Sequence, residues 1–336
     1  MKADARYVAG VLLALVATAL WGATFLGPAA VSPVGPVYLV FGRYFVFGIL
    51  SLVILAVNRN RAMSIGVKRA LVAAHLGVVG YVGFYLFFSF AAAVGGGALA
   101  SVATGVMPAA ITIASNVIRK EIAWRSLALP IGITSLGLFV VNVRFSDAGP
   151  GKTAGELVLT TLLALAACAV WSYFVVVNGL IIKRTDGPRV DNTTWTAMIG
   201  AGAFFASFLL LPFAEIGGGV APTNGQALFV RFVVVSVLLA TLGSWCASWC
   251  WNRAARRVST VVMGQLIALE TIFGTVFNLV WEQRWPTPQE VAGATLVTIG
   301  VIWCVHLFGR SRARVVDPTT PGGSTHVVPG LRSGVD

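Results

Sequence analysis

Ten apolar runs of about 20 residues restrict what this chain can fold into more than any other feature of the sequence. A helix of that length crosses the roughly 30 Å hydrocarbon core of a bilayer. The connections between the runs are too short for an extramembrane domain, so the pattern predicts an all-α polytopic membrane protein with ten transmembrane helices. We expect the spans at residues 7–27, 37–57, 70–93, 97–118, 126–143, 156–182, 194–214, 229–251, 259–281 and 289–308.

The composition excludes a soluble protein. Hydrophobic residues make up 57% of the chain and charged residues only 11%, against about 25% charged residues in soluble domains. All four cysteines, Cys168, Cys246, Cys250 and Cys304, fall within apolar runs, where a thiol behaves as a small hydrophobe. We therefore expect no disulfide framework, no metal site and no cofactor.

The positive charges predict the orientation of the chain. When the connections are assigned alternately to the two sides, nineteen Lys and Arg residues fall on one side and four on the other, while Arg43 lies inside a span. The positive-inside rule then places both termini in the cytoplasm, as in a multi-pass protein of the cell (inner) membrane. This distribution also accounts for the net charge of +12 without a nucleic-acid partner. The tail at 309–336 is rich in Pro, Gly and Ser and is predicted to be disordered and cytoplasmic.

Weak internal similarity divides the chain into two halves. Trp21 in span 1 and Trp171 in span 6 lie in similar sequence contexts, 150 residues apart. In spans 4 and 9, an offset of 162 residues aligns two stripes with i, i+4 spacing. These stripes consist of Thr104, Pro108, Thr112 and Asn116 in the first half and Leu266, Glu270, Gly274 and Asn278 in the second.

Five helices in each half mean that the second copy enters the membrane from the opposite side. We therefore expect a first repeat at 1–143, a periplasmic linker at 144–155 and an inverted second repeat at 156–308. Inverted repeats characterise secondary transporters, in which the substrate site lies near the midplane between the halves.

Five motifs, in order, resemble the drug/metabolite transporter superfamily of the EamA type. They are Trp21-Gly22-Ala23-Thr24-Phe25, Phe41-Gly42-Arg43-Tyr44-Phe45, the segment from Met107-Pro108 to Lys120-Glu121, GQLIALETIFG at 264–274 and WEQRWPTPQE at 281–290. The resemblance covers residues 7–308, with Thr271 at a position where a proline often follows the glutamate. It implies ten helices in two inverted repeats and the export of amino acids or similar small metabolites.

Two ionisable residues inside the predicted spans are candidates for function, because a charge at the centre of a transmembrane helix costs at least about 2.5–3.5 kcal/mol. Glu270 lies at the middle of span 9 and Arg43 seven residues into span 2. Desolvation favours the neutral form of a carboxylate, so Glu270 is a candidate for proton coupling or for binding a substrate amine. We expect Arg43 to recognise a substrate carboxylate. The alternative, which weighs equally, is a Glu270–Arg43 ion pair that only sets helix register.

Other polar residues could line a central cavity. Thr112, Asn116 and Asn278 would offer hydrogen-bonding groups to it, and Gly274 lies on the same helix face as Asn278. Such residues also serve as hydrogen-bonding contacts between membrane helices, and this reading is slightly favoured for the threonines. Pro108 would kink span 4 and free a carbonyl, so it is a candidate hinge or a packed kink.

Aromatic residues away from the span ends would suit an apolar or aromatic substrate if they face inward. They are Trp21, Tyr81, Tyr85, Trp171, Trp245 and Trp249. Taken singly, each is more commonly a packing or lipid contact. Trp281 and Trp285 lie at a span end, as expected of an interfacial belt.

The sequence therefore predicts a secondary transporter that exports small metabolites by alternating access, with lipid and a small molecule as partners; proton coupling and the oligomeric state are left open. The alternative is a non-transporting intramembrane protein. An intramembrane enzyme needs an acid, a base or a metal in register, and the chain offers one central carboxylate and no central histidine, so we expect no enzymatic activity. An assembly or sensor protein would need no polar cavity.

Overall fold

The computed structural model describes residues 2–95, 100, 105–120, 122–142, 153–183, 190–215 and 218–316. Across these residues the chain forms helices and no β-strand, apart from one isolated bridge between Val34 and Val220. The predicted all-α class is therefore confirmed. Thr104, Glu121, most of the predicted linker and residues 317–336 of the predicted tail lie outside the described residues.

The first half of the chain forms long apolar helices joined by short connections. They are α1 (Lys2–Ala23) with its extensions η1 (Thr24–Leu26) and α2 (Gly27–Val31), α3 (Pro36–Val57), the short α4 (Arg59–Ile65), α5 (Val67–Gly77) continuing through η2 (Val78–Gly83) into α6 (Phe84–Gly95), α8 (Met107–Arg119) and α9 (Trp124–Asn142). α16, the last helix of the second half, runs eight residues past the predicted end of span 10, to Val316.

The second half also forms apolar helices joined by short connections. It consists of α10 (Ala154–Ile182), α11 (Asn192–Ser207) with η3 (Phe208–Phe213), α12 (Gln226–Leu238) continuing through η4 (Leu239–Cys246) into α13 (Ala247–Ala255), α14 (Thr260–Leu266), α15 (Leu269–Glu282) and α16 (Pro288–Val316).

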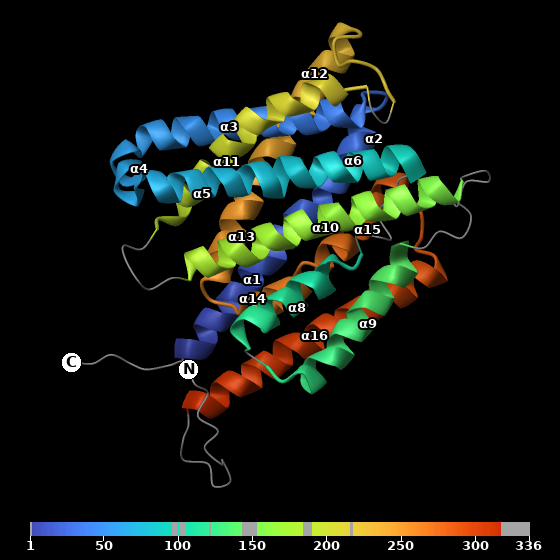
Figure 1. Ribbon diagram of the computed structural model, residues 1–336. Helices are drawn as coiled ribbons and strands as arrows, with labels where there is room; N and C mark the ends of the chain where they lie inside the picture. The colour runs from blue at the N-terminus through green and yellow to red at the C-terminus, as the bar shows by residue number, and fades with distance from the viewer. Residues whose placement is uncertain are drawn as a thin grey trace.

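Nine helical segments in the described part of the chain are long and apolar enough to cross a membrane, and each corresponds to one predicted span. The fourth predicted span, 97–118, includes residues outside the described part and is represented by the 13-residue α8. The polytopic membrane class is thus confirmed, and the count of ten spans stays a prediction. The start of α1 and the end of α16 lie at the same end of the bundle, together with α4 (Figure 1).

The helices of the two predicted halves interleave rather than forming separate bundles. α3 packs against α11, α9 against α16, and α8 against α14. α1 packs against α13 and α15, and in the same way α10 packs against α6 and α8 (Figure 1). Small residues permit these close crossings: a Cβ atom at Gly77 would lie 2.0 Å from the Ile199 carbonyl oxygen. Such paired contacts are the pattern that an inverted repeat produces, and we keep the division into repeats as a proposal.

Two local irregularities also recur in equivalent places. The third helix of each half contains a π-helical segment, η2 in the first and η4 in the second. The helices α8 and α15 both end on a residue in the left-handed conformation, Lys120 and Gln283. π-Helical turns are rare and often occur at functional sites, so the residues around η2 and η4 are candidates for a functional site.

Candidate functional site

Arg43 projects from α3 into the centre of the bundle and contacts both π-helical regions. Its Nε donates to the Ser244 hydroxyl at 2.8 Å, and its Nη2 donates to the Gly243 carbonyl at 2.9 Å, both in η4. Its Nη1 donates to the Tyr85 hydroxyl at 2.9 Å, at the start of α6. The side chain is 5% exposed. Arg43 therefore has three neutral hydrogen-bond partners and forms no ion pair in the described part of the chain.

Three tyrosines surround this guanidinium. The rings of Tyr44 and Tyr85 lie 5.5 and 5.7 Å from the Arg43 guanidinium carbon, within the range of cation–π attraction. Tyr81, in η2, hydrogen-bonds Ser248 of α13 and packs edge-to-face on Tyr44. The Tyr81–Ser248 contact therefore joins the third helices of the two halves directly.

The predicted tryptophans extend this aromatic cluster. Trp21 of α1 packs against Trp171 of α10 with ring centroids 5.8 Å apart, and against Trp251 of α13 at 5.1 Å. Trp171 also contacts Tyr81, at 5.8 Å. Trp21 and Tyr81 are 3% and 1% exposed, so the cluster is closed in this conformation. The structure thus brings together Trp21, Trp171, Tyr81, Tyr85 and Arg43, five of the residues that the sequence indicated as candidates.

Two polar atoms in this cluster have no hydrogen-bond partner among the described residues. They are the Tyr44 hydroxyl and the Trp171 indole nitrogen, both buried. By contrast, the hydroxyls of Tyr81 and Tyr85 and the indole nitrogen of Trp195 are all paired. Buried polar groups are usually paired, so the centre holds hydrogen-bonding capacity that the described residues do not use.

Glu270 lies beside a break in the ninth predicted span. The helix tightens between α14 and α15, where the amides of Ala268 and Glu270 bond to carbonyls three residues back. The Glu270 side chain is half-buried and has no hydrogen bond or ion pair to the described residues. The Glu270–Arg43 ion pair, one of the two alternatives that the sequence left open, is not formed in this conformation: Arg43 bonds to Ser244, Gly243 and Tyr85, and its charge acts on Glu270 only at longer range.

Glycines bring α1 close to the Glu270 region. A Cβ atom at Gly22 would lie 2.8 Å from the Glu270 carbonyl oxygen and 2.7 Å from the Gly274 amide nitrogen. A Cβ atom at Gly274 would lie 2.2 Å from the ring of Phe25. Gly274 therefore permits helix packing in this structure, rather than lining an open cavity.

The polar stripe on α8 is packed into the protein interior. Thr112 accepts a hydrogen bond from Gln265 at 2.9 Å, and Gln265 accepts one from Thr134 at 2.9 Å. All three side chains are almost fully buried. Thr112 thus joins α8, α14 and α9, which is the interhelical contact that the sequence slightly favoured for threonine.

Both asparagines of the stripes bond to backbone. Asn116 is 1% exposed and makes two hydrogen bonds, at 3.0 and 3.1 Å, with the backbone of Ile122, after the end of α8. Asn278 is half-buried and donates to the Gly274 carbonyl at 3.0 Å, within its own helix. In this conformation neither amide is offered to a central cavity.

Pro108 differs in position from the kink that the sequence predicted. It lies in the first turn of α8, where a proline has no helical hydrogen bond to lose. The described residues just before it form a turn. Span 4 is therefore interrupted at Pro108 instead of bending around it, and a hinge there stays a proposal.

The two remaining tryptophan candidates, Trp249 and Trp245, make no hydrogen bond to the described residues of the cluster. Trp249 donates to the Thr193 hydroxyl at 3.1 Å and lies under Arg253, whose guanidinium carbon is 5.2 Å from the ring centroid. The Trp245 indole nitrogen is buried and has no hydrogen-bond partner among the described residues. Five residues of the cluster and its contacts were not among the candidates that the sequence indicated: Tyr44, Gly243, Ser244, Ser248 and Trp251. The Trp, Gly and Ser residues of 243–251 could have indicated a site there. Their pattern, however, does not predict a π-helical segment.

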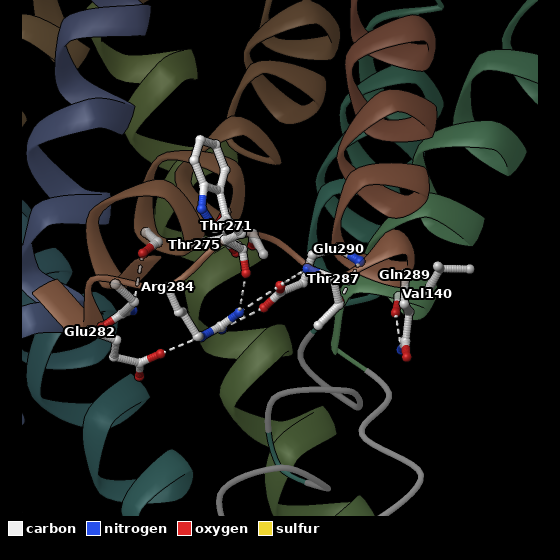
Figure 2. A network of polar contacts seen from close by, with 11 residues as sticks. Val140, Thr271, Thr275, Glu282, Arg284, Thr287, Gln289 and Glu290 are labelled. Carbon is white, nitrogen blue, oxygen red and sulfur yellow. Dashed lines mark hydrogen bonds and ion pairs between the residues drawn. The ribbon is translucent and has the colours of Figure 1, made fainter. Parts of the chain in front are cut away.

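A polar network joins the end of α15 to α16 and α9 (Figure 2). Arg284 bonds both carboxylate oxygens of Glu290 at 2.7 and 2.8 Å and also contacts Glu282. These hydrogen bonds, which Arg284 donates to Glu290 and to Glu282, raise the pKa of Arg284 above its ordinary value, and those to Glu290 have the larger effect. Gln289 donates to the Val140 carbonyl at 2.7 Å. Nearby, Trp285 is 91% exposed, as expected for an interfacial residue.

Comparisons with known proteins point to one family. The model of the "EamA-like transporter family" matches the chain twice, at residues 8–143 and 158–305. The chain is 26% identical over 316 residues to "Inner membrane protein YtfF" of Escherichia coli (strain K12), covering 89% of this chain and 95% of that protein. It also resembles a solved structure described only as "Crystal structure of protein", with a TM-score of 0.70 and 17% identity over 90% of this chain and 98% of the other. This last likeness concerns the fold alone.

Proposed function

Since the chain belongs to the EamA-like transporter family, we propose that it is a secondary transporter that exports small carboxylate-bearing metabolites, amino acids or related compounds, by alternating access. The membrane helices, the family and the resemblance to an inner membrane protein support a membrane transporter. The substrate class and the mechanism are the proposal. Its site is the cluster of Arg43, Tyr44, Tyr81, Trp21 and Trp171, with Glu270 as the coupling residue.

One observation carries the substrate class: Arg43 is a buried cation that forms no ion pair with a carboxylate of the described residues, although its charge and that of Glu270 attract each other at longer range. An unpaired charge in a low-dielectric interior is costly, and Ser244, Tyr85 and the Gly243 carbonyl supply only neutral acceptors. A guanidinium binds a carboxylate through two parallel hydrogen bonds. A substrate carboxylate would therefore supply the missing charge, displacing one or two of these neutral partners.

The surroundings of Arg43 fit the rest of such a substrate. The rings of Tyr44, Tyr81, Trp21 and Trp171 supply apolar surface for stacking. The unpaired Tyr44 hydroxyl and Trp171 indole nitrogen supply further hydrogen bonds. The cluster is closed here, so the proposal requires that one face opens to admit substrate.

Glu270 is the proposed coupling group. Its carboxylate is half-buried and without a partner among the described residues, beside the α14–α15 break. A proton or a substrate amine would each remove the cost of its charge. Proton coupling and amine binding are thus two versions of one role, and a pH gradient distinguishes them.

A non-transporting assembly or sensor protein remains the second candidate, because Thr112 and Asn116 sit in a closed core. Neither Glu270 nor Arg43 forms an ion pair with the described residues, and this favours transport, since a structural core would pair them. We further propose that the termini are cytoplasmic, which agrees with the start of α1 and the end of α16 lying at one end of the bundle (Figure 1).

The test is an efflux screen of labelled amino acids, amines and nucleosides from cells that express the chain. We expect retention of a carboxylate-bearing compound to fall on expression, and Arg43→Lys to abolish that effect. Glu270→Gln should abolish flux driven by a pH gradient, whereas Glu282→Gln, at the exposed end of the same helix, should not. Efflux of none of these compounds, or efflux unaffected by Arg43→Lys, would refute the proposed substrate class.

A further inference from the structure

The end of the bundle opposite α4 is closed by a contact between two connections that are distant in sequence. The Val220 amide donates to the Pro33 carbonyl at 2.9 Å, and the Gly35 amide donates to the Val220 carbonyl at 3.1 Å. We call this contact between 33–35 and 218–220 the latch. It joins the connection after α2 to the connection before α12, and therefore the two predicted halves.

Glycines make this close backbone approach possible. A Cβ atom at Gly219 would lie 2.6 Å from the Gly35 Cα atom and 2.8 Å from the Pro33 carbonyl oxygen. Gly218, next to it, has a similar positive φ, 75° against 91°, but its Cβ atom would meet nothing within 4 Å. The latch thus depends on the absence of a side chain at residue 219 and not at residue 218.

The side chains under the latch are separate from the main core. Val31, Val34, Leu39 and Phe232 form their own small hydrophobic cluster, whereas Trp21, Trp171 and Tyr81 belong to the main hydrophobic core. The latch can therefore part without disturbing the packing around Trp21 and Tyr81. It is held by two backbone hydrogen bonds and a small apolar contact, with Arg231 donating to the Ser32 carbonyl at 2.7 Å beside it.

The helix that follows the latch is divided by η4. Before η4, α12 packs against α2 and α3; after it, α13 packs against α1 and α11. The two parts of one membrane helix thus contact different neighbours on either side of a π-helical segment, and Arg43 holds that segment through Gly243 and Ser244. A change in the contacts of Arg43 would therefore act at the point where α12 and α13 meet.

The inverted counterpart of this contact lies at the other end of the bundle. The connection after α10 corresponds to that after α2, and α4 corresponds to the connection before α12. Their described contact is an ion pair between Arg61 and Asp191 at 4.0 Å, with both side chains exposed. Each end of the bundle therefore has a contact between the equivalent pair of connections.

We propose that the latch is a gate: α12 and the connection before it move about η4, the latch parts, and the end of the bundle that carries α2 opens to the central cluster. This proposal deepens the proposed transport function and rests on it. When a substrate carboxylate binds Arg43, it replaces the hydrogen bonds of Arg43 to Gly243 and Ser244. The backbone of η4 is then free to change conformation, which links substrate binding to the gate.

The first test locks the latch. Residues paired across neighbouring strands have Cα atoms about 5 Å apart, within disulfide range, so Val34→Cys with Val220→Cys should crosslink in a chain whose four native cysteines are replaced by alanine. We expect oxidation to reduce flux in proteoliposomes at least tenfold and a reductant to restore it, with each single-cysteine variant unaffected. Failure to crosslink, or a crosslinked chain with full flux, would overturn the proposal.

The second test opens the latch. Gly219→Ala should speed labelling of Val34→Cys by an impermeant maleimide about 5- to 150-fold, the effect of losing two net backbone hydrogen bonds. Gly218→Ala is the matched control, with the same backbone strain and no contact, and should label at the rate of its parent. Equal labelling of the two variants would refute the role of the contact.

Labelling also separates this proposal from the proposed function. The compound with the strongest signal in the efflux screen should increase labelling of Val34→Cys at least threefold, because transport opens the gate. If that compound is transported and labelling does not change, the latch is static and the proposal is wrong. If no compound is transported, the proposed function fails, and labelling of Gly219→Ala still reports whether the latch parts.

Discussion

Gly22 lies where α1 crosses α15, and replacing it with alanine tests how closely these helices must pack. The new Cβ atom would lie 2.7 Å from the Gly274 nitrogen and 2.8 Å from the Glu270 carbonyl oxygen. Both are backbone atoms, so only separation of the two helices relieves the clash. Overpacking costs about 1–3 kcal/mol, while the change from glycine to alanine in a helix gains about 0.5–1 kcal/mol. We expect a net loss of up to about 2.5 kcal/mol from these two ranges.

Gly132→Ala provides the control, since a Cβ atom at this position in α9 would meet nothing within 4 Å. It should stabilise the protein by about 0.5–1 kcal/mol. The assay is denaturant-induced unfolding of the purified protein in detergent micelles, with flux measured in parallel. Gly22→Ala should unfold at lower denaturant concentration and lose flux, because Glu270 is displaced. Equal stability of the two variants, with full flux in both, would refute the close crossing.

Three further predictions concern single side chains. Arg43→Lys should reduce flux at least tenfold while the protein stays folded, because an ammonium lacks the planar fork that contacts Ser244, Tyr85 and a carboxylate together; unchanged flux would contradict this. Asn178→Leu should cost about 1–3 kcal/mol in unfolding, since it unpairs Trp195 and Asn252, whereas Asn142→Leu, which loses only a bond within its own helix, should be near neutral. Burial alone would raise the pKa of Asp191, but hydrogen bonds from Thr194 outweigh it and lower the pKa below 3.8. The Asp191 contribution to stability is therefore present above pH 3.8 and lost as the pH falls through the lowered pKa. Asp191→Asn should remove that part of the acid dependence of the free energy of unfolding. An unchanged dependence at acid pH would contradict this.

The sequence alone predicts the helical class well, because hydrophobic length is a one-dimensional signal. Nine spans appear close to their predicted places, and the central positions of Arg43 and Trp21 follow from their depth within a span. Spacing also predicts that Thr112 and Glu270 belong to equivalent stripes, and this equivalence stays a prediction. What each side chain contacts across the bundle is not encoded in spacing, so the closed packing of Thr112 against Gln265 was one of two open readings.

Features set by tertiary packing were the ones that the sequence did not predict. The π-helical segments η2 and η4 carry no glycine or proline pattern that separates them from ordinary helix, and they place Gly243 and Ser244 against Arg43. The break between α14 and α15 likewise has no proline to signal it. The partners of Arg43 could not be predicted. At its depth in the membrane, an ion pair with Glu270 and a set of neutral hydrogen-bond acceptors are both compatible with the sequence.

Counterflow in proteoliposomes tests the central claim most directly. Vesicles containing the purified protein are loaded with an excess of the unlabelled compound identified in the efflux screen and diluted into a trace of its labelled form. One site that faces the two sides in turn predicts transient accumulation of label above equilibrium, and Arg43→Lys should abolish it. Label that only equilibrates, at a rate independent of internal substrate, would contradict alternating access through this site.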